Sequence, residues 1–296
     1  MDISTNNSKK PMKRIAAIHD LSCFGRCALT VVMPTLSAMG FQVIPVPTAL
    51  LSTHTGGFDD LYFKDLTADM TDISDHFDRL GLKFDAIYSG FLGSEEQIDI
   101  VLDFIDRFSD EDTLIFVDPV MGDDGKLYST YTEKLKERMK ELCSKADIIT
   151  PNLTEACFLC GEEYIDTESM TESEIFELAN HLRSKLETIS SSDIFITGIP
   201  HSLTKFGTYG HTKDTLSDGY IYSVERIKKS YPGTGDLFAS VLLGCILSGD
   251  DIGDAMKFAS DYICKVMEYS ARFDTPERDG VAFEHFIYEL AEHTRG

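Results

Sequence analysis

Short apolar runs alternate with helical patterns along most of this chain, and this alternation constrains the fold more than any other feature. Helical periodicity is expected over 26–39, 95–108, 132–144 and 172–188. The runs between these segments have the length and composition of buried strands, and they lie at 15–18, 41–47, 84–88, 114–117, 148–149 and 194–197. Such βα units build a mostly parallel sheet with helices on both faces. We therefore expect an α/β fold arranged as a three-layer α/β/α sandwich.

The pattern changes in the last third of the chain. Residues 203–227 alternate Gly, Thr, Tyr and Asp between turn signals, which predicts a small antiparallel ribbon. Three further helices are expected, over 236–248, 251–268 and 281–293. No Pro-, Gly- or Ser-rich linker separates two cores, so we expect a single domain over 14–296 that follows a flexible N-terminal extension, residues 1–13.

The charge of the chain excludes several classes of partner. Lys and Arg number 27 against 50 Asp and Glu, a formal net charge of −23. Such a surface repels polyanions, so we expect no nucleic acid and no anionic membrane as partners. Seven scattered cysteines, an odd number, are typical of a reducing cytoplasm rather than of a disulfide framework.

One uncharged segment, residues 27–58, is long enough to cross a bilayer. Pro34, Pro45 and Pro47 interrupt it, and the apolar pattern breaks at Gly40. This arrangement favours a helix followed by a buried strand over a membrane span.

The strongest local signal is Tyr231-Pro-Gly-Thr-Gly-Asp236, which precedes an apolar helix. Gly233 and Gly235 allow a sharp turn and a close approach of the backbone to a ligand. The first N–H groups of a helix have no partner within it, so together they form an anion site that needs no basic side chain. Asp236 is compatible with two interpretations, a cap of the helix or a base that takes a proton from an attacking hydroxyl.

Two further segments combine acidic residues with the end of a strand. Asp118 ends an apolar run and is followed by a glycine-flanked acidic turn, which suits either Mg²⁺ or a turn cap. Asn152 and Glu155 lie three residues apart at the start of a helix. They are compatible with helix capping or with orientation of a metal-bound water against phosphate.

Ligands of open α/β sheets bind beyond the carboxyl ends of the strands, which gives weight to polar residues that follow apolar runs. Asp20 follows the first run. His54 and Thr55 follow the second, in the loop Ser52-Thr-His-Thr-Gly-Gly57. His54 is compatible with a structural role, with titration near neutrality or with stacking on a heteroaromatic ring.

These segments, in this order, resemble the ribokinase-like superfamily of ATP-dependent small-molecule kinases over about residues 14–286. The superfamily resemblance rests on Asp118-Pro-Val-Met-Gly122 and Gly233-Thr-Gly-Asp236. Leu51-Ser-Thr-His-Thr-Gly56 and Tyr88-Ser-Gly-Phe-Leu-Gly93 are similar to segments of its vitamin B6 branch, the pyridoxal/pyridoxamine kinases.

The resemblance implies phosphorylation of the 5′-hydroxymethyl group of pyridoxal, pyridoxamine or pyridoxine. Asp236 would be the base, and the N–H groups of Gly233, Thr234 and Gly235 would stabilise the transferring phosphoryl group. Residues expected at the Mg²⁺–ATP phosphates and the nucleotide are Asp118, Glu155, Asn152 and Thr197, of which Asp118 and Glu155 would serve the metal. Residues expected to line the pyridine pocket are Asp20, His54, Thr55 and Phe91.

The resemblance also implies the partners. ATP is the co-substrate, Mg²⁺ is the metal cofactor, and a monovalent cation such as K⁺ is a second cofactor that it allows. A homodimer in the cytoplasm is expected, with a lid formed by the ribbon or by the loop 122–126.

Two positions depart from the family pattern. Asp20 stands where Ser is usual, which affects the choice among vitamers. Thr197 stands where some members carry Lys, so we expect the nucleotide to be held by a helix N-terminus and Mg²⁺ and hardly at all by basic side chains.

Two alternatives remain beside the B6 kinase. A hydroxymethylpyrimidine kinase of thiamine synthesis shares the fold, but its typical glycine-rich segment after the first strand is absent here. A non-catalytic nucleotide- or B6-binding protein on the same scaffold would gain nothing from a carboxylate, Asp236, beside bound phosphate.

Overall fold

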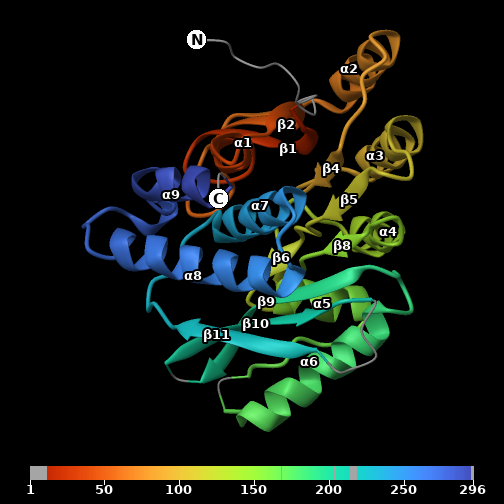
Figure 1. Cartoon of the computed structure of the whole chain (residues 1–296). Coiled ribbons are helices and arrows are strands. Elements are labelled where there is room, and N and C mark those ends of the chain that lie inside the picture. The colour runs from red at the N-terminus through yellow and green to blue at the C-terminus, as the bar shows by residue number, and fades with distance from the viewer. Residues whose placement is uncertain (1–11, 168, 203, 214–218, 295–296) are drawn as a thin grey trace, which may run out of the picture.

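A nine-stranded sheet forms the centre of the described part of the chain (Figure 1). The computed structural model describes residues 12–294 except 168, 203 and 214–218. The predicted N-terminal extension therefore lies outside the described residues apart from Met12 and Lys13, and so do two residues of the predicted turn at 217–219.

The strand order is β11-β10-β9-β8-β5-β4-β1-β2-β3. The six strands from β9 to β2 run parallel. At one edge of the sheet β3 is antiparallel to β2, and at the other edge β10 is antiparallel to both β9 and β11. The ribbon predicted over 203–227 is thus confirmed, and β6 and β7 form a separate two-stranded ribbon. The strands are β1 (Arg14–Phe24), β2 (Gln42–Thr53), β3 (Phe63–Asp65), β4 (Ala86–Ser89), β5 (Leu114–Val117), β6 (Gly122–Asp123), β7 (Lys126–Leu127), β8 (Ile148–Ile149), β9 (Asp193–Ser202), β10 (Lys205–His211) and β11 (Tyr220–Glu225).

Helices cover both faces of the sheet, as the alternating pattern predicts. The helices are α1 (Leu29–Ala38), α2 (Thr67–Arg79), α3 (Glu95–Phe108), α4 (Glu133–Cys143), α5 (Leu153–Cys160), α6 (Glu172–Leu186), α7 (Thr234–Ser248), α8 (Ile252–Ser270) and α9 (Ile287–His293), with 3₁₀ turns η1 (Glu277–Asp279) and η2 (Phe283–Phe286).

Side-chain alternation along the strands divides the core into two layers. In β1, Ile15 and Ala17 join the core beneath α1, α7, α8 and α9. Ala16 and Ile18 point to the other face and join the core with α3, α4, α5 and α6. Because successive strand residues face opposite sides, one continuous apolar run supplies both layers.

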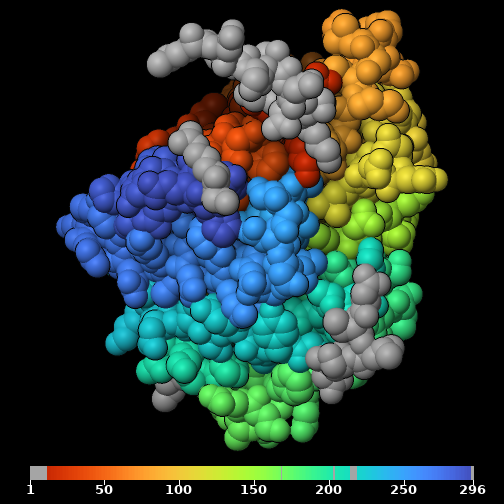
Figure 2. Space-filling view, viewed as in Figure 1, coloured from red at the N-terminus to blue at the C-terminus, as the bar shows by residue number. Residues whose placement is uncertain are grey.

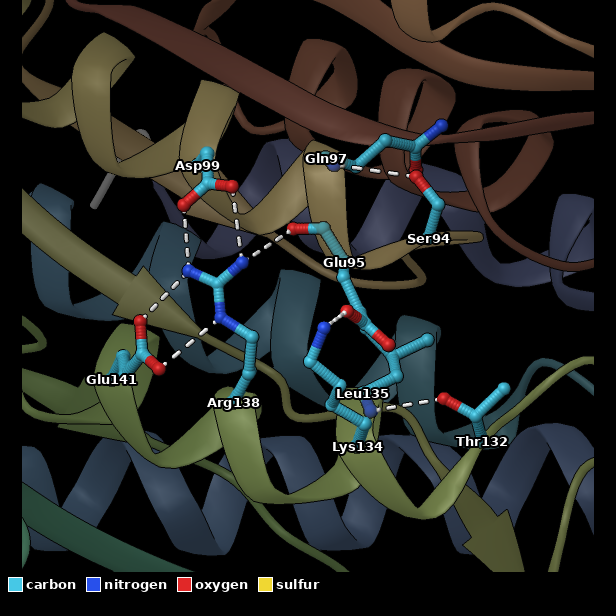
Figure 3. A network of polar contacts seen from close by, with 9 residues as sticks. All are labelled: Ser94, Glu95, Gln97, Asp99, Thr132, Lys134, Leu135, Arg138 and Glu141. Atoms are coloured by element: carbon cyan, nitrogen blue, oxygen red, sulfur yellow. Dashed lines mark hydrogen bonds and ion pairs between the residues drawn. The ribbon is translucent and has the colours of Figure 1, made fainter.

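Polar contacts at the surface fix how α3 and α4 pack (Figure 3). Ser94 caps α3 by accepting the Gln97 N–H. The Arg138 guanidinium of α4 donates to both carboxylate oxygens of Asp99, at 3.0 and 2.6 Å, and also to Glu141. Exposed ion pairs contribute less than about 1 kcal/mol each. The two-point contact with Asp99 therefore sets the orientation of the helices more than their stability.

Several elements differ from the sequence predictions, and β9 for example extends to Ser202 so that Thr197 lies within the strand. Helix α2 was not expected, because two of its three buried residues, Thr67 and Ser74, are polar and leave little apolar periodicity. The helix expected over 281–293 is α-helical only from Ile287, after a 3₁₀ turn. Strand β1 continues beyond its apolar run to Phe24, so Asp20 lies within a strand rather than after one.

The uncharged segment 27–58 forms α1 and β2, in agreement with the helix and strand expected there. Among the described residues, no helix combines the length and the apolar character that a bilayer crossing requires.

Candidate active site

The loop before α7 requires glycine at its last position. Gly233 is the N-cap residue and has φ +78°, a left-handed conformation that other residues rarely adopt. A Cβ atom on Gly233 would lie 1.9 Å from the Arg26 carbonyl oxygen. The loop therefore packs directly on the segment before α1, and α7 begins at Thr234 with its first N–H groups directed outward from the helix end.

Asp236 does not cap α7, so the capping interpretation is wrong. Its Oδ2 accepts the backbone N–H of Ala28 at 2.8 Å, a contact between residues 208 positions apart. The side chain is only 15% exposed, and burial followed by repulsion from Asp20 raises the pKa of Asp236 to about 7. A carboxylate with a pKa near neutrality can both accept and release a proton at physiological pH.

A cavity of about 680 Å³ joins this loop to the carboxyl ends of β5, β8 and β9. This volume is typical of a small-molecule site. Eight of the twelve predicted site residues line it, namely Asp118, Asn152, Glu155, Thr197, Gly233, Thr234, Gly235 and Asp236.

The acidic residues of the cavity are buried close together. Asp118 and Glu155 are 5% and 3% exposed. Burial raises the pKa of both groups, and the charges of Glu155 and Asp236 raise that of Asp118 further. Oxygen donors whose negative charges repel one another fit a hard divalent cation, which relieves that repulsion.

Asn152 and Glu155 form the capping box that the sequence allowed. The Asn152 side chain accepts the Glu155 N–H at 2.9 Å, and Glu155 Oε2 accepts the Asn152 N–H at 2.8 Å. Glu155 Oε1 accepts the Met121 N–H. Both carboxylate oxygens are therefore held by the backbone, which fits contact with a cation through water. Thr197 lies beside Asn152 in an isolated bridge.

The four residues predicted for the pyridine pocket are not among those that line this cavity. Asp20 is 7% exposed and accepts the Ser22 hydroxyl at 2.8 Å. Burial raises the pKa of Asp20, and the carboxylate is near enough to repel Asp236. Thr55 and Phe91 are half-buried, and Phe91 packs edge-on against Tyr131.

His54 is held by two backbone contacts. Its Nδ1 accepts the Gly56 N–H at 3.1 Å, so Nε2 carries the proton and donates to the Arg278 carbonyl oxygen at 2.6 Å. The ring is edge-on to Phe58. These contacts fix the ring in one tautomer and tie the β2 loop to the segment around η1.

His19 is a residue that the sequence analysis missed. It is fully buried, neither ring nitrogen has a hydrogen-bond partner among the described residues, and Nδ1 lies 4.0 Å from Asp236 Oδ1. Burial lowers the pKa of His19 to about 3, so the ring is neutral. Its position next to Asp20 in the sequence was the available signal.

Basic side chains were also missed. Arg226, Lys228 and Lys229 are among the residues that line the cavity. The expectation that basic residues hardly contribute to the nucleotide site stays a prediction, and these three residues are the ones with which to test it. The signal was the run Arg-Ile-Lys-Lys at 226–229, a local concentration of positive charge in an acidic chain just before the glycine loop.

The chain is similar to known kinases over nearly its whole length. The phosphomethylpyrimidine kinase family matches residues 33–278. A pyridoxine/pyridoxal/pyridoxamine kinase of Bordetella avium is 29% identical over 282 residues, covering 90% of each chain.

Solved structures share the fold. A Bacteroides thetaiotaomicron protein assigned as a phosphomethylpyrimidine kinase, crystallised with pyridoxal, is 38% identical with a TM-score of 0.86, covering 94% of this chain and 96% of the other. The pyridoxal kinase of Lactobacillus plantarum is 27% identical with a TM-score of 0.83, covering 95% and 97%. The matched region contains the glycine loop, the carboxylate cluster and the sheet that positions them, and the chain therefore belongs to the phosphomethylpyrimidine kinase family, whose ribokinase-like members are ATP-dependent phosphotransferases.

Proposed function

We propose that this protein transfers the γ-phosphoryl group of ATP to the 5′-hydroxymethyl group of a vitamin B6 vitamer. The observation that carries the proposal is the position of Asp236, a buried carboxylate with a raised pKa beside the glycine loop in a cavity of nucleotide size. The pyridine substrate is supported by the similar kinases that act on B6 vitamers and by the 38%-identical protein crystallised with pyridoxal.

In this reaction Asp236 is the base. Oδ2 is occupied by the Ala28 N–H, which leaves Oδ1 to accept the proton of the attacking hydroxyl. The N–H groups of Gly233, Thr234 and Gly235 stabilise the charge that develops on the transferring phosphoryl oxygens. Little covalent chemistry is required of the protein in such a transfer, so orientation and electrostatics supply the rate.

Asp118 and Glu155 would hold Mg²⁺ together with the ATP phosphates, and the backbone contacts of both Glu155 oxygens fit a contact through water. The ion would neutralise phosphate charge and orient the phosphoryl group. Asn152, Thr197, Lys228 and Lys229 line the same cavity, to which the two lysines would add positive charge.

The pyridine pocket is proposed to lie between Asp236 and Asp20, with His54, Thr55 and Phe91 around the ring. Burial keeps Asp20 protonated to a higher pH than an exposed carboxyl. The Asp20 side chain would hydrogen-bond the ring nitrogen or the 3-hydroxyl of the substrate, which a serine would contact differently.

Several properties of the whole molecule are part of the proposal. One kinase domain would comprise residues 14–296, and the protein would act as a homodimer. K⁺ would be an activator, which omission of K⁺ from the assay tests. All seven cysteines are unpaired, which supports a reducing cytoplasm. Light scattering of the purified chain tests the dimer.

Turnover with each vitamer tests the function. The full-length protein is incubated with Mg²⁺–ATP and pyridoxal, pyridoxamine or pyridoxine, and ADP release is followed with Asp236→Asn as the inactive control. We expect the native protein to turn over at least one vitamer and Asp236→Asn to turn over none.

A hydroxymethylpyrimidine kinase is the second candidate, because the matching family is described by that chemistry. Hydroxymethylpyrimidine belongs in the same assay. Turnover of this substrate far above that of every vitamer would overturn the B6 assignment.

A further inference from the structure

A second group of metal-binding side chains lies at the opposite end of α7 from the glycine loop. It consists of Cys245 in the last turns of α7, Asp250 in the turn to α8, and His293 at the end of α9. One ligand atom from each of the three lies within 4.8 Å of the other two. Asp250 Oδ2 is 2.6 Å from His293 Nε2.

The local fold holds these side chains together. Gly249 ends α7 with φ +102°, and the Asp250 N–H then donates to the Cys245 carbonyl oxygen at 3.1 Å. This turn directs Asp250 back toward the thiol. The His293 ring stacks on Phe258 of α8, with ring centroids 3.9 Å apart and an interplanar angle of 20°. The three groups are thus fixed by three different helices or turns.

We propose that Cys245, Asp250 and His293 bind one zinc-class transition-metal ion. Thiolate sulfur, imidazole nitrogen and carboxylate oxygen are the ligands that Zn²⁺ takes, with a water in the fourth position. Bond lengths of about 2.0–2.3 Å place tetrahedral ligand atoms roughly 3.3–3.8 Å apart. Nitrogen and oxygen ligands at about 2.0–2.2 Å from the ion lie roughly 3.3–3.5 Å apart, so the Asp250–His293 contact widens by about 0.7–0.9 Å when the ion enters. The thiol proton leaves to solvent as the sulfur binds.

The ion is separate from the proposed catalytic Mg²⁺. Residues 234 and 245 are 11 positions apart on α7, which corresponds to about 16 Å along the helix. Figures 1 and 2 show α9, in dark blue, next to α1 and above α8 in the view. The metal would fasten the last turn of the chain, at His293, to the body of the domain.

Cobalt spectroscopy of the full-length chain tests the site. The purified protein is stripped with chelator and titrated with Co²⁺ alone, then with Zn²⁺. We expect a near-ultraviolet thiolate-to-cobalt charge-transfer band and intense visible bands that saturate at one ion per chain and disappear when Zn²⁺ is added. Co²⁺ bound by the oxygen ligands of the active site gives no charge-transfer band.

Variants assign the ligands. His293→Ala and Cys245→Ser should lose the bands, and the increase in melting temperature that Zn²⁺ gives the native chain should vanish with them. Cys264→Ser, which changes a half-buried cysteine outside the cluster, should keep both. His293 lies at the end of the described chain, so its variant remains informative if Cys245→Ser does not fold. Absence of the bands in the native chain, or their persistence in His293→Ala, overturns the proposal and leaves a cluster of three neighbouring side chains without metal.

Discussion

Replacing Asp236 with asparagine should inactivate the enzyme and stabilise the fold at the same time. Burial raises the pKa of Asp236 from 3.8 to about 7. A tenfold change in proton affinity is worth about 1.4 kcal/mol, so ionising this carboxylate in the folded chain costs up to about 4 kcal/mol relative to the unfolded chain. Asparagine has the same shape, retains an oxygen for the Ala28 N–H and cannot ionise.

The sign of the pH dependence follows from proton binding. Between about pH 4 and pH 7 the folded protein retains the Asp236 proton that the unfolded chain releases. The free energy of unfolding therefore falls as the pH rises through this window, and the loss is complete above about pH 7. Asp236→Asn removes this contribution. Its advantage over the native chain should be near zero at pH 4 and up to about 4 kcal/mol at pH 8.

Thermal unfolding at several pH values measures this effect, without nucleotide or divalent cation. At roughly 2 °C per kcal/mol for a chain of this size, the variant should melt up to about 8 °C above the native protein at pH 8. Asp72→Asn, on the exposed face of α2, is the matched change of charge and should give no comparable shift. A variant that is no more stable than the native chain at pH 8, or equally stabilised at low pH, would refute the reasoning. The kcat of the same variant should be about 10²- to 10⁴-fold lower than that of the native protein, as expected when a general base is removed.

Four other predictions test the site. The native kcat/KM should rise with pH through about 7, because Asp236 must lose its proton to act as the base; a flat profile would contradict this. Asp20→Ser should change the ratio of kcat/KM among the three vitamers more than the KM for ATP, and equal changes for all vitamers would exclude Asp20 from ring recognition. Gly233→Ala should cost about 1–3 kcal/mol from its left-handed conformation, with a further cost from the backbone contact at 1.9 Å, and should abolish turnover; denaturant unfolding and the ADP assay measure the two effects. Lys228→Ala should raise the KM for ATP severalfold with a smaller effect on kcat, whereas Lys64→Ala, on the edge strand β3, should leave both unchanged.

Features that depend on short-range periodicity could be read from the sequence. The runs at 114–117 and 148–149 coincide with β5 and β8, and α3 begins and ends where its apolar spacing predicts. Helix α2 was not predicted from the sequence, because its buried face carries threonine and serine and its hydrophobic periodicity is therefore weak. The polar end of β1 was not predicted for a similar reason, and the position of Asp20 inside the strand was therefore not predicted either.

The sequence predicts the glycine loop as an anion site because the residues that would form this site are consecutive in the chain. The local sequence left open whether Asp236 caps the helix or acts as a base, since the N–H that its side chain accepts belongs to Ala28, and neither segment specifies the other. Likewise, the cationic side chains at 226–229 enter the cavity only because β11 lies at the edge of the sheet and returns the chain toward α7.

The sequence alone determined the α/β architecture, the net negative charge of the chain, and the glycine loop at the start of α7, because each depends on composition or on spacing within a few residues. The tertiary structure decided which carboxylates share a cavity, how far burial moves their pKa values, and that Cys245, Asp250 and His293 meet at the far end of the same helix. The physical reason is that local periodicity fixes which face of an element is buried, while the order of strands in the sheet fixes which distant residues that face meets.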